Sequence, residues 1–238
     1  MVACSTSADK PRPLLIFAAA SLADAFEDIE ETFETQYGQR LSVSYGGSQM
    51  LAQQIASGAP ADMFISAGEA PASFLAERTL TELPHTILLT NTLVIAVRDD
   101  GPTITSVQDL ISSSVARVAI ANPDLAPAGH YARDSLTHLG LWAKLEPKIV
   151  FGPDVRVTLA YVESGNADAA LVYATDAKIG RNIKVLDIVP KNSYEAIVYP
   201  AIVVRASDLK PEALEFLNFL RSATSDAIFR RYGFESLE

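Results

Sequence analysis

Cysteine, tryptophan, methionine and histidine are scarce in this 238-residue chain, with one, one, three and three copies. The single cysteine, Cys4, excludes an intrachain disulfide framework and any metal site built from several cysteines. Long apolar runs are missing as well. The longest have about seven or eight residues, far short of the roughly 20 that a membrane-spanning helix needs.

Basic side chains are in deficit, with 19 Lys and Arg against 29 Asp and Glu, so the formal net charge is −10. Nucleic acids and anionic membrane surfaces are bound by clustered Lys and Arg. Both are therefore excluded as the main partner. Hydrophobic residues make up 49% of the chain and charged residues 20%, which is enough for a packed core in one large or two modest domains.

Catalytic motifs are also lacking. There is no Walker A loop, no H-E-x-x-H and no G-x-G-x-x-G, and residues 46–50 (GGSQM) lack the second glycine of a nucleophile elbow. The sequence therefore predicts a protein that is not an enzyme. The alternative is a hydrolase or transferase with Ser21 or Ser48 as nucleophile, which would need a histidine such as His130 beside it.

Short apolar strands alternate with amphipathic helices along the chain. Residues 14–19 have the composition of a buried strand, and the helical spacing that follows stops at Gly38. The same unit repeats from 41 to 58, and strand and helix patterns continue to alternate between 117 and 177. This alternation predicts an α/β architecture with mostly parallel sheets.

Two β-rich stretches, residues 87–97 and 196–204, are long enough to carry the chain from one domain to another, and Pro200 breaks the second. They favour a two-lobed clamp with a hinge over the alternative, one large doubly wound domain. The predicted parts are a flexible tail at 1–13, a discontinuous lobe I at 14–90 plus 200–238, and lobe II at 91–199.

Four turns are expected to open helices, around Ser21, Ser48, Ala128 and Val155. In open α/β sheets, ligands bind where helix N-termini point, and each N-terminus carries roughly half a positive charge and unpaired N–H groups. Four that converge would suit a dianion. The simpler alternatives are that the two serines only cap their helices and that Tyr173, at a strand end, belongs to the core.

Six segments, in order along residues 14–235, resemble motifs of the periplasmic molybdate-binding proteins, which are the capture subunits of ABC importers. Each motif alone is weak, and together they are specific. The segments are residues 17–22 (FAAASL), Ser48 with 51–62 (LAQQIASGAPAD), 127–132 (PAGHYA), 154–156 (DVR), 172–173 (VY) with 176–177 (DA), and 228–234 (IFRRYGF). Gly46, Gly47 and Gln49 around Ser48 depart from the family, which often has small hydroxyl residues there.

The resemblance implies a type II periplasmic-binding-protein fold. In this fold each lobe is a mixed, mostly parallel sheet flanked by helices, and the ligand lies in the cleft between the lobes. It also implies a set of residues that bind the molybdate oxyanion. Ser21 and Ser48 would donate from lobe I through hydroxyl and backbone N–H groups. Ala128 and Val155 would donate backbone N–H groups, and Tyr173 its hydroxyl, from lobe II.

The function implied by the resemblance is high-affinity capture of molybdate, with tungstate as a near match, in the periplasm. A monomer would deliver the ligand to the membrane permease of an ABC importer. No cofactor is expected, and no side chain would coordinate the metal, which arrives as its oxyanion. A site with donors only should reject a protonated phosphate. A clamp for another small anion, such as sulfate, is the alternative, and the Ser-dependent hydrolase is less favoured.

Residues 1–5 (MVACS) resemble the end of a bacterial lipoprotein signal. In such a signal the cysteine becomes the lipidated first residue, so Cys4 is a candidate lipid-anchor site. The alternative is an incidental cysteine in a terminal tail.

Overall fold

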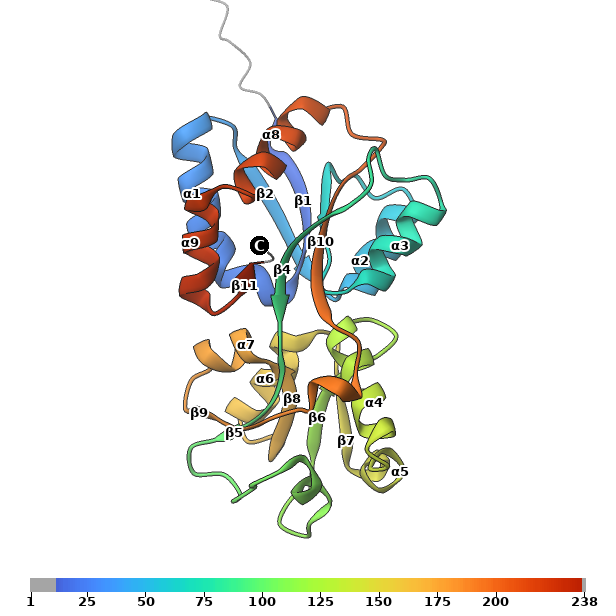
Figure 1. Ribbon diagram of the computed structural model, residues 1–238, viewed down its shortest axis with the longest axis vertical. Helices are drawn as coiled ribbons and strands as arrows, with labels where there is room; N and C mark the ends of the chain where they lie inside the picture. The colour runs from blue at the N-terminus through green and yellow to red at the C-terminus, as the bar shows by residue number, and fades with distance from the viewer. Residues whose placement is uncertain (1–11, 237–238) are drawn as a thin grey trace, which may run out of the picture.

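The computed structural model describes residues 12–236 as two lobes, stacked one above the other in Figure 1, each built on its own β-sheet. Cys4 lies outside the described residues. The strand order is β11-β4-β10-β3-β1-β2 in the first sheet and β7-β6-β8-β5-β9 in the second. Two separate sheets confirm the two-lobed α/β fold and exclude a single doubly wound domain.

Lobe I contains the six-stranded sheet and five α-helices. Its strands are β1 (Leu14–Ala19), β2 (Leu41–Gly46), β3 (Met63–Ile65), β4 (Thr86–Asn91), β10 (Ile197–Val203) and β11 (Glu235–Ser236). Its helices are α1 (Ala23–Tyr37), α2 (Ser48–Ala56), α3 (Glu69–Glu77), α8 (Lys210–Leu220) and α9 (Ala223–Tyr232), with a 3-10 turn at Ala20–Leu22.

Lobe II contains the five-stranded sheet and four α-helices. Its strands are β5 (Leu93–Arg98), β6 (Val118–Ala121), β7 (Ile149–Gly152), β8 (Ala169–Tyr173) and β9 (Ile183–Ile188). Its helices are α4 (Pro127–His138), α5 (Trp142–Leu145), α6 (Val155–Glu163) and α7 (Ala174–Ile179), with 3-10 turns at Val107–Ile111, Glu146–Lys148 and Lys191–Ser193.

Both sheets are mixed. β1 pairs in parallel with β2 and β3, and β6 pairs in parallel with β7 and β8. β10 and β5 run antiparallel to their neighbours. β9 was not predicted, because it is an edge strand whose partly exposed residues form no continuous apolar run.

The chain crosses between the lobes on two strands that lie side by side (Figure 1). The predicted strand 87–97 is two strands, β4 and β5, separated at Thr92, and Asn91 at the end of β4 pairs with Ile197 at the start of β10. β10 does not break at Pro200. The register shifts between Tyr199 and Pro200, which is how a strand accommodates a residue without an N–H. We propose lobe boundaries close to the predicted ones, 14–90 plus 200–238 and 91–199, with the sheet of lobe I extending to Asn91 and resuming at Ile197.

The core of lobe I forms where α1 and α8 pack together against the sheet. Phe26 and Phe33 of α1 are fully buried, and both meet Phe216 of α8 edge-to-face, with ring centroids 6.3 and 4.8 Å away. Such pairs add to the free energy gained from burial alone. α1 ends at Gly38, whose φ of +72° is the left-handed cap that the sequence predicts.

Asp62 ties the start of β1 to the segment after β10. Its side chain is 2% exposed and accepts two hydrogen bonds from Arg12 (2.7 and 2.9 Å), one from the Leu15 N–H (2.8 Å) and one from the Ser207 hydroxyl (2.5 Å). Burial alone would raise the pKa of this carboxyl. The hydrogen bonds from Arg12, Ser207 and Leu15 outweigh it and hold the pKa below its ordinary value.

Replacing the carboxylate by an amide, Asp62→Asn, should lower the free energy of unfolding at pH 7 by about 1.5–3 kcal/mol, since the bonds to a charged acceptor are lost. A carboxyl whose pKa is depressed in the folded state stabilises the protein above its unfolded pKa. This contribution disappears as pH falls through the folded value. The difference in the free energy of unfolding between wild type and Asp62→Asn, measured in urea, should therefore shrink at acidic pH.

The exposed neighbour Asp208 provides the control, since Asp208→Asn should change the free energy of unfolding by less than about 0.5 kcal/mol. An equal loss at every pH would contradict this prediction.

Candidate functional site

A small buried cavity lies between the lobes, and both lobes contribute to its wall. The space between the surrounding atoms, including the part that opens to solvent, is about 200 Å³. The lining residues are Ala19, Ala20, Ser21, Gly46, Gly47, Ser48 and Ala67 from lobe I, and Ala126, Pro127, Ala128, Asp154, Val155 and Tyr173 from lobe II. All five residues predicted from the sequence are among them, and none is more than 4% exposed.

Three α-helices begin at this cavity. α2 starts at Ser48, α4 at Pro127 and α6 at Val155, and the first N–H groups of a helix have no acceptor within it. Because proline has no N–H, Ala128 supplies the first N–H of α4. The N-termini therefore bring unpaired donors and partial positive charge to the cavity from both lobes.

Asp154 caps α6 and leaves one donor free. Its carboxylate accepts from the backbone N–H groups of Arg156 (2.8 Å) and Val157 (2.9 Å). The Val155 N–H, at the first helical position, is not used by this cap. Among the described residues that line the cavity, Asp154 is the one acid, and its carboxylate is engaged by its own helix, while the neighbouring Val155 N–H is left outside the cap.

The two serines do not cap helices, so the simpler alternative for them is wrong. Neither makes a side-chain capping bond. The Ser21 hydroxyl lies 2.9 Å from the Tyr199 hydroxyl, and the Ser48 hydroxyl accepts from the Ala67 N–H at 3.1 Å. Both side chains are held by tertiary contacts at the cavity wall.

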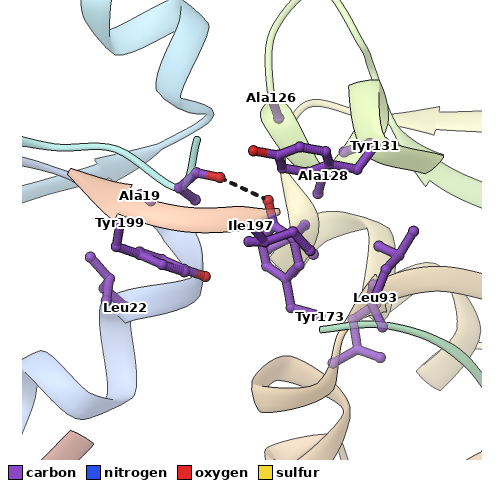
Figure 2. Packing of buried hydrophobic residues seen from close by; sticks show 14 of the residues in the cluster. Ala19, Leu22, Leu93, Ala126, Ala128, Tyr131, Tyr173, Ile197 and Tyr199 are labelled. Carbon is purple, nitrogen blue, oxygen red and sulfur yellow. Dashed lines mark hydrogen bonds between the residues drawn. The ribbon is translucent and has the colours of Figure 1, made fainter. Parts of the chain in front are cut away.

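Tyr173 reaches across the boundary between the lobes. It is fully buried, and its hydroxyl donates to the Ala67 carbonyl of lobe I at 3.3 Å (Figure 2). Burial, together with the nearby Tyr199, raises the pKa of Tyr173 well above its ordinary value. The phenol therefore keeps its proton and remains a donor. Of the described residues that line the cavity, none is a lysine or an arginine.

The geometry needed for a serine nucleophile is not formed. His130 pairs with Asp134 (Nε2 to Oδ2, 3.1 Å) and lies 3.4 Å from an Arg133 nitrogen. In the described part of the chain, no histidine bonds to either serine, and no three His, Cys, Asp or Glu side chains gather as a metal site. Of the helices within residues 12–236, none has the length and apolarity to cross a bilayer.

Arg156, beside the cavity, joins the lobes. From α6 it pairs with Asp24 of α1, and its Nε lies 3.4 Å from the Ala20 carbonyl and 2.8 Å from Asp176 Oδ1. The contact with Asp176 is an ion pair without hydrogen-bond geometry, and neither carboxylate oxygen has a hydrogen-bond donor among the residues that the structure describes. Burial raises the pKa of Asp176 to about 7, although Arg156 opposes the shift. Sequence analysis could not find this contact, since residues 24 and 156 are brought together only by the fold.

Gly47 is a point of closest approach between the lobes. The neighbouring Met50 N–H donates to the Leu125 carbonyl of lobe II at 3.2 Å. A Cβ on Gly47 would lie 2.3 Å from the same carbonyl oxygen. The contact between the lobes at the cavity therefore requires glycine at this position.

The sequence model for bacterial extracellular solute-binding proteins matches residues 14–235. The chain belongs to this family. A putative ABC transporter substrate-binding lipoprotein, YvgL of Bacillus subtilis, is 38% identical over 97% of this chain and 89% of its own length. The molybdate-binding protein ModA of Escherichia coli is 35% identical over 98% of this chain and 92% of its own.

Among solved structures, the periplasmic molybdate-binding protein of Azotobacter vinelandii superposes with a TM-score of 0.84. It is 26% identical, and the match covers 94% of this chain and 100% of that one. Membership of a solute-binding family identifies the protein as a binding protein and not an enzyme. It also agrees with a cavity that is made of hydrogen-bond donors and lies between two lobes.

Gly47→Ala should prevent full closure of this solute-binding protein. The backbone of Gly47 (φ −66°, ψ 131°) suits alanine, so the clash with Leu125 arises only when the lobes meet. We expect the variant to have a larger radius of gyration than wild type in small-angle X-ray scattering. The melting temperature of the ligand-free variant should lie within a few degrees of that of ligand-free wild type. An unchanged radius would contradict the prediction.

Arg156→Gln should make stability more sensitive to pH. A carboxyl with a raised pKa in the folded state destabilises the protein as pH rises from its unfolded value through its folded one. Removing Arg156 raises the pKa of Asp176 further. The free energy of unfolding of the variant should therefore be lower than that of wild type by about 1–3 kcal/mol at pH 8–9. The difference between the two proteins should be smaller at pH 5.

The double variant Arg156→Gln, Asp176→Asn is the control, because residue 176 then has no carboxyl to ionise. Its unfolding free energy should lose this extra dependence on pH. Identical slopes in the single and double variants would show that Asp176 does not titrate as stated.

Proposed function

We propose that this protein captures molybdate, and tungstate almost equally, and delivers it to the membrane permease of an ABC importer. The observation that carries the proposal is the cavity itself. Three helix N-termini, two serine hydroxyls and one tyrosine hydroxyl surround it, and within residues 12–236 no basic side chain lines it. The molybdate-binding relatives from Escherichia coli and Azotobacter vinelandii support the same ligand.

A buried dianion without a countercharge requires many oriented donors, because an unpaired buried charge is costly. In the proposed complex Ser21 and Ser48 donate from lobe I, and Ala128, Val155 and Tyr173 donate from lobe II. Each lobe then supplies part of the site, so ligand binding favours lobe closure. The donors suit an oxyanion that carries no proton, whereas phosphate near neutral pH must also donate.

We further propose that the protein acts as a monomer in the periplasm and needs no cofactor. The lipoprotein relative from Bacillus subtilis supports the reading of Cys4 as a lipidated residue in the native form. Mass spectrometry of the native protein tests this part of the proposal. An unmodified Cys4 behind an uncleaved leader would contradict it.

Titration calorimetry with molybdate, tungstate, sulfate and phosphate tests the ligand. We expect tight and similar binding of molybdate and tungstate, weaker binding of the smaller sulfate, and the weakest binding of phosphate. An absence of molybdate binding, or tighter binding of sulfate, would refute the proposal and leave a clamp for another anion.

Ser21→Ala and Ser48→Ala should each cost about 1.5–3 kcal/mol of molybdate binding, as expected for a hydrogen bond to a charged group. This corresponds to roughly ten- to hundredfold in Kd. Ser225→Ala is the matched control. Ser225 is also fully buried, but its hydroxyl donates to the Phe219 carbonyl in lobe I. This control should lower stability and leave the Kd unchanged. If the two cavity variants also bind like wild type, the site lies elsewhere.

A further inference from the structure

The amide of Asn91 has a defined orientation at the point where the chain leaves lobe I. The Thr92 backbone N–H, which can only donate, is 2.8 Å from Asn91 Oδ1. The other side of the amide is therefore Nδ2, which can only donate. It donates to the Tyr199 hydroxyl at 3.0 Å and to the Thr175 hydroxyl at 2.8 Å.

Tyr199 must then direct its own proton elsewhere. Its oxygen accepts from Asn91, and the side chain is fully buried, so water is not available as an acceptor. Burial, with Asp176 nearby, raises the pKa of Tyr199, so the phenol is protonated. Among the described residues, the remaining hydrogen-bond partner of this hydroxyl is Ser21 Oγ, 2.9 Å away. Tyr199 therefore donates to Ser21 (Figure 2 shows Tyr199 at the boundary between the lobes).

We propose that Asn91 and Tyr199 are positioning residues that fix Ser21 as a donor to the bound oxyanion. Ser21 Oγ accepts from Tyr199, and its own proton has no other hydrogen-bond partner in the described part of the chain, so it points to the cavity that Ser21 lines. The inference rests on the proposed function, since it assigns the polarity of one donor in the same site.

The Ser48 hydroxyl is oriented in the same way, but directly by a backbone N–H. Its Oγ accepts from the Ala67 backbone N–H at 3.1 Å, so its proton is also left for the cavity. Both hydroxyls therefore have an oxygen already occupied by a donor of the protein. One of the two lone pairs of each hydroxyl oxygen is thus engaged by the protein, and the hydroxyl proton faces the cavity, so a proton on a ligand oxygen would meet another proton there. Discrimination against protonated oxyanions therefore depends on Asn91 and Tyr199 at Ser21, and on the Ala67 N–H at Ser48.

Tyr199→Phe tests the inference by removing only the hydroxyl that Ser21 accepts from. We expect the Kd for molybdate to rise about five- to thirtyfold, as for a weakened bond to a charged group. The affinity for inorganic phosphate, measured by competition near pH 7, should fall less than the affinity for molybdate, or should rise. The reason is that Ser21 Oγ no longer accepts from Tyr199 and is free to accept the phosphate proton. The ratio of the two affinities should narrow accordingly.

Tyr232→Phe is the matched control. Tyr232 lies on α9 of lobe I, outside the cavity wall, and its hydroxyl donates to Asp28 at 2.7 Å. The substitution therefore removes the same chemical group at a different place. Its two affinities should equal those of wild type. A merely structural role of Tyr199 would weaken both anions by the same factor, and an unchanged ratio in Tyr199→Phe would therefore overturn the inference.

Asn91→Leu provides a second variant if Tyr199→Phe does not fold. It leaves the Tyr199 hydroxyl without the donor that sets its direction, so the affinity ratio should narrow again. If wild type binds molybdate and both variants keep the wild-type ratio of molybdate to phosphate affinity, the inference is overturned and the proposed function remains. Wild-type protein that does not bind molybdate would overturn both.

Discussion

The structure depends on one constraint, which is that helix N-termini from two lobes must meet around one small cavity lined by buried residues. Helices α2, α4 and α6 follow β2, β6 and β7, each of which pairs in parallel with a neighbour in its sheet. The carboxyl ends of these strands therefore face the other lobe. This arrangement requires close packing between helix starts and strand ends, which explains the need for glycine at Gly129. A Cβ on Gly129 in α4 would lie 1.9 Å from the Ala121 carbonyl of β6, so the first turn of α4 could not approach the strand end.

The charge of the whole chain does not decide the charge of the ligand. A net charge of −10 resides mostly on side chains in contact with water, and salt screens such charges over roughly 8 Å. In the cavity, N–H and O–H dipoles act at hydrogen-bond distance with little screening. Asp154 illustrates the point, because it lines the cavity as an acid yet its carboxylate is engaged by two N–H groups of its own helix.

Much of the fold could be predicted from sequence because it depends on local patterns. The helices expected to open around Ala128 and Val155 begin at Pro127 and Val155. The five predicted residues meet at one cavity. What each serine bonds to could not be predicted. Tyr199 is 178 positions from Ser21, and no spacing rule links them, whereas a preference for serine at helix starts suggested capping, which does not occur here.

The hydroxyl groups of the cavity take their direction from the backbone. A hydroxyl can rotate and exchange donor for acceptor, but a backbone N–H cannot. Ser48 is oriented by the Ala67 N–H directly. Ser21 is oriented by the Thr92 N–H through Asn91 and Tyr199. Thr92 separates β4 from β5, and Tyr199 lies on β10, so this chain of bonds runs through both strands that join the lobes. The strands that join the lobes thus also determine which way the Ser21 proton points, and selectivity by hydrogen-bond polarity needs no charged side chain.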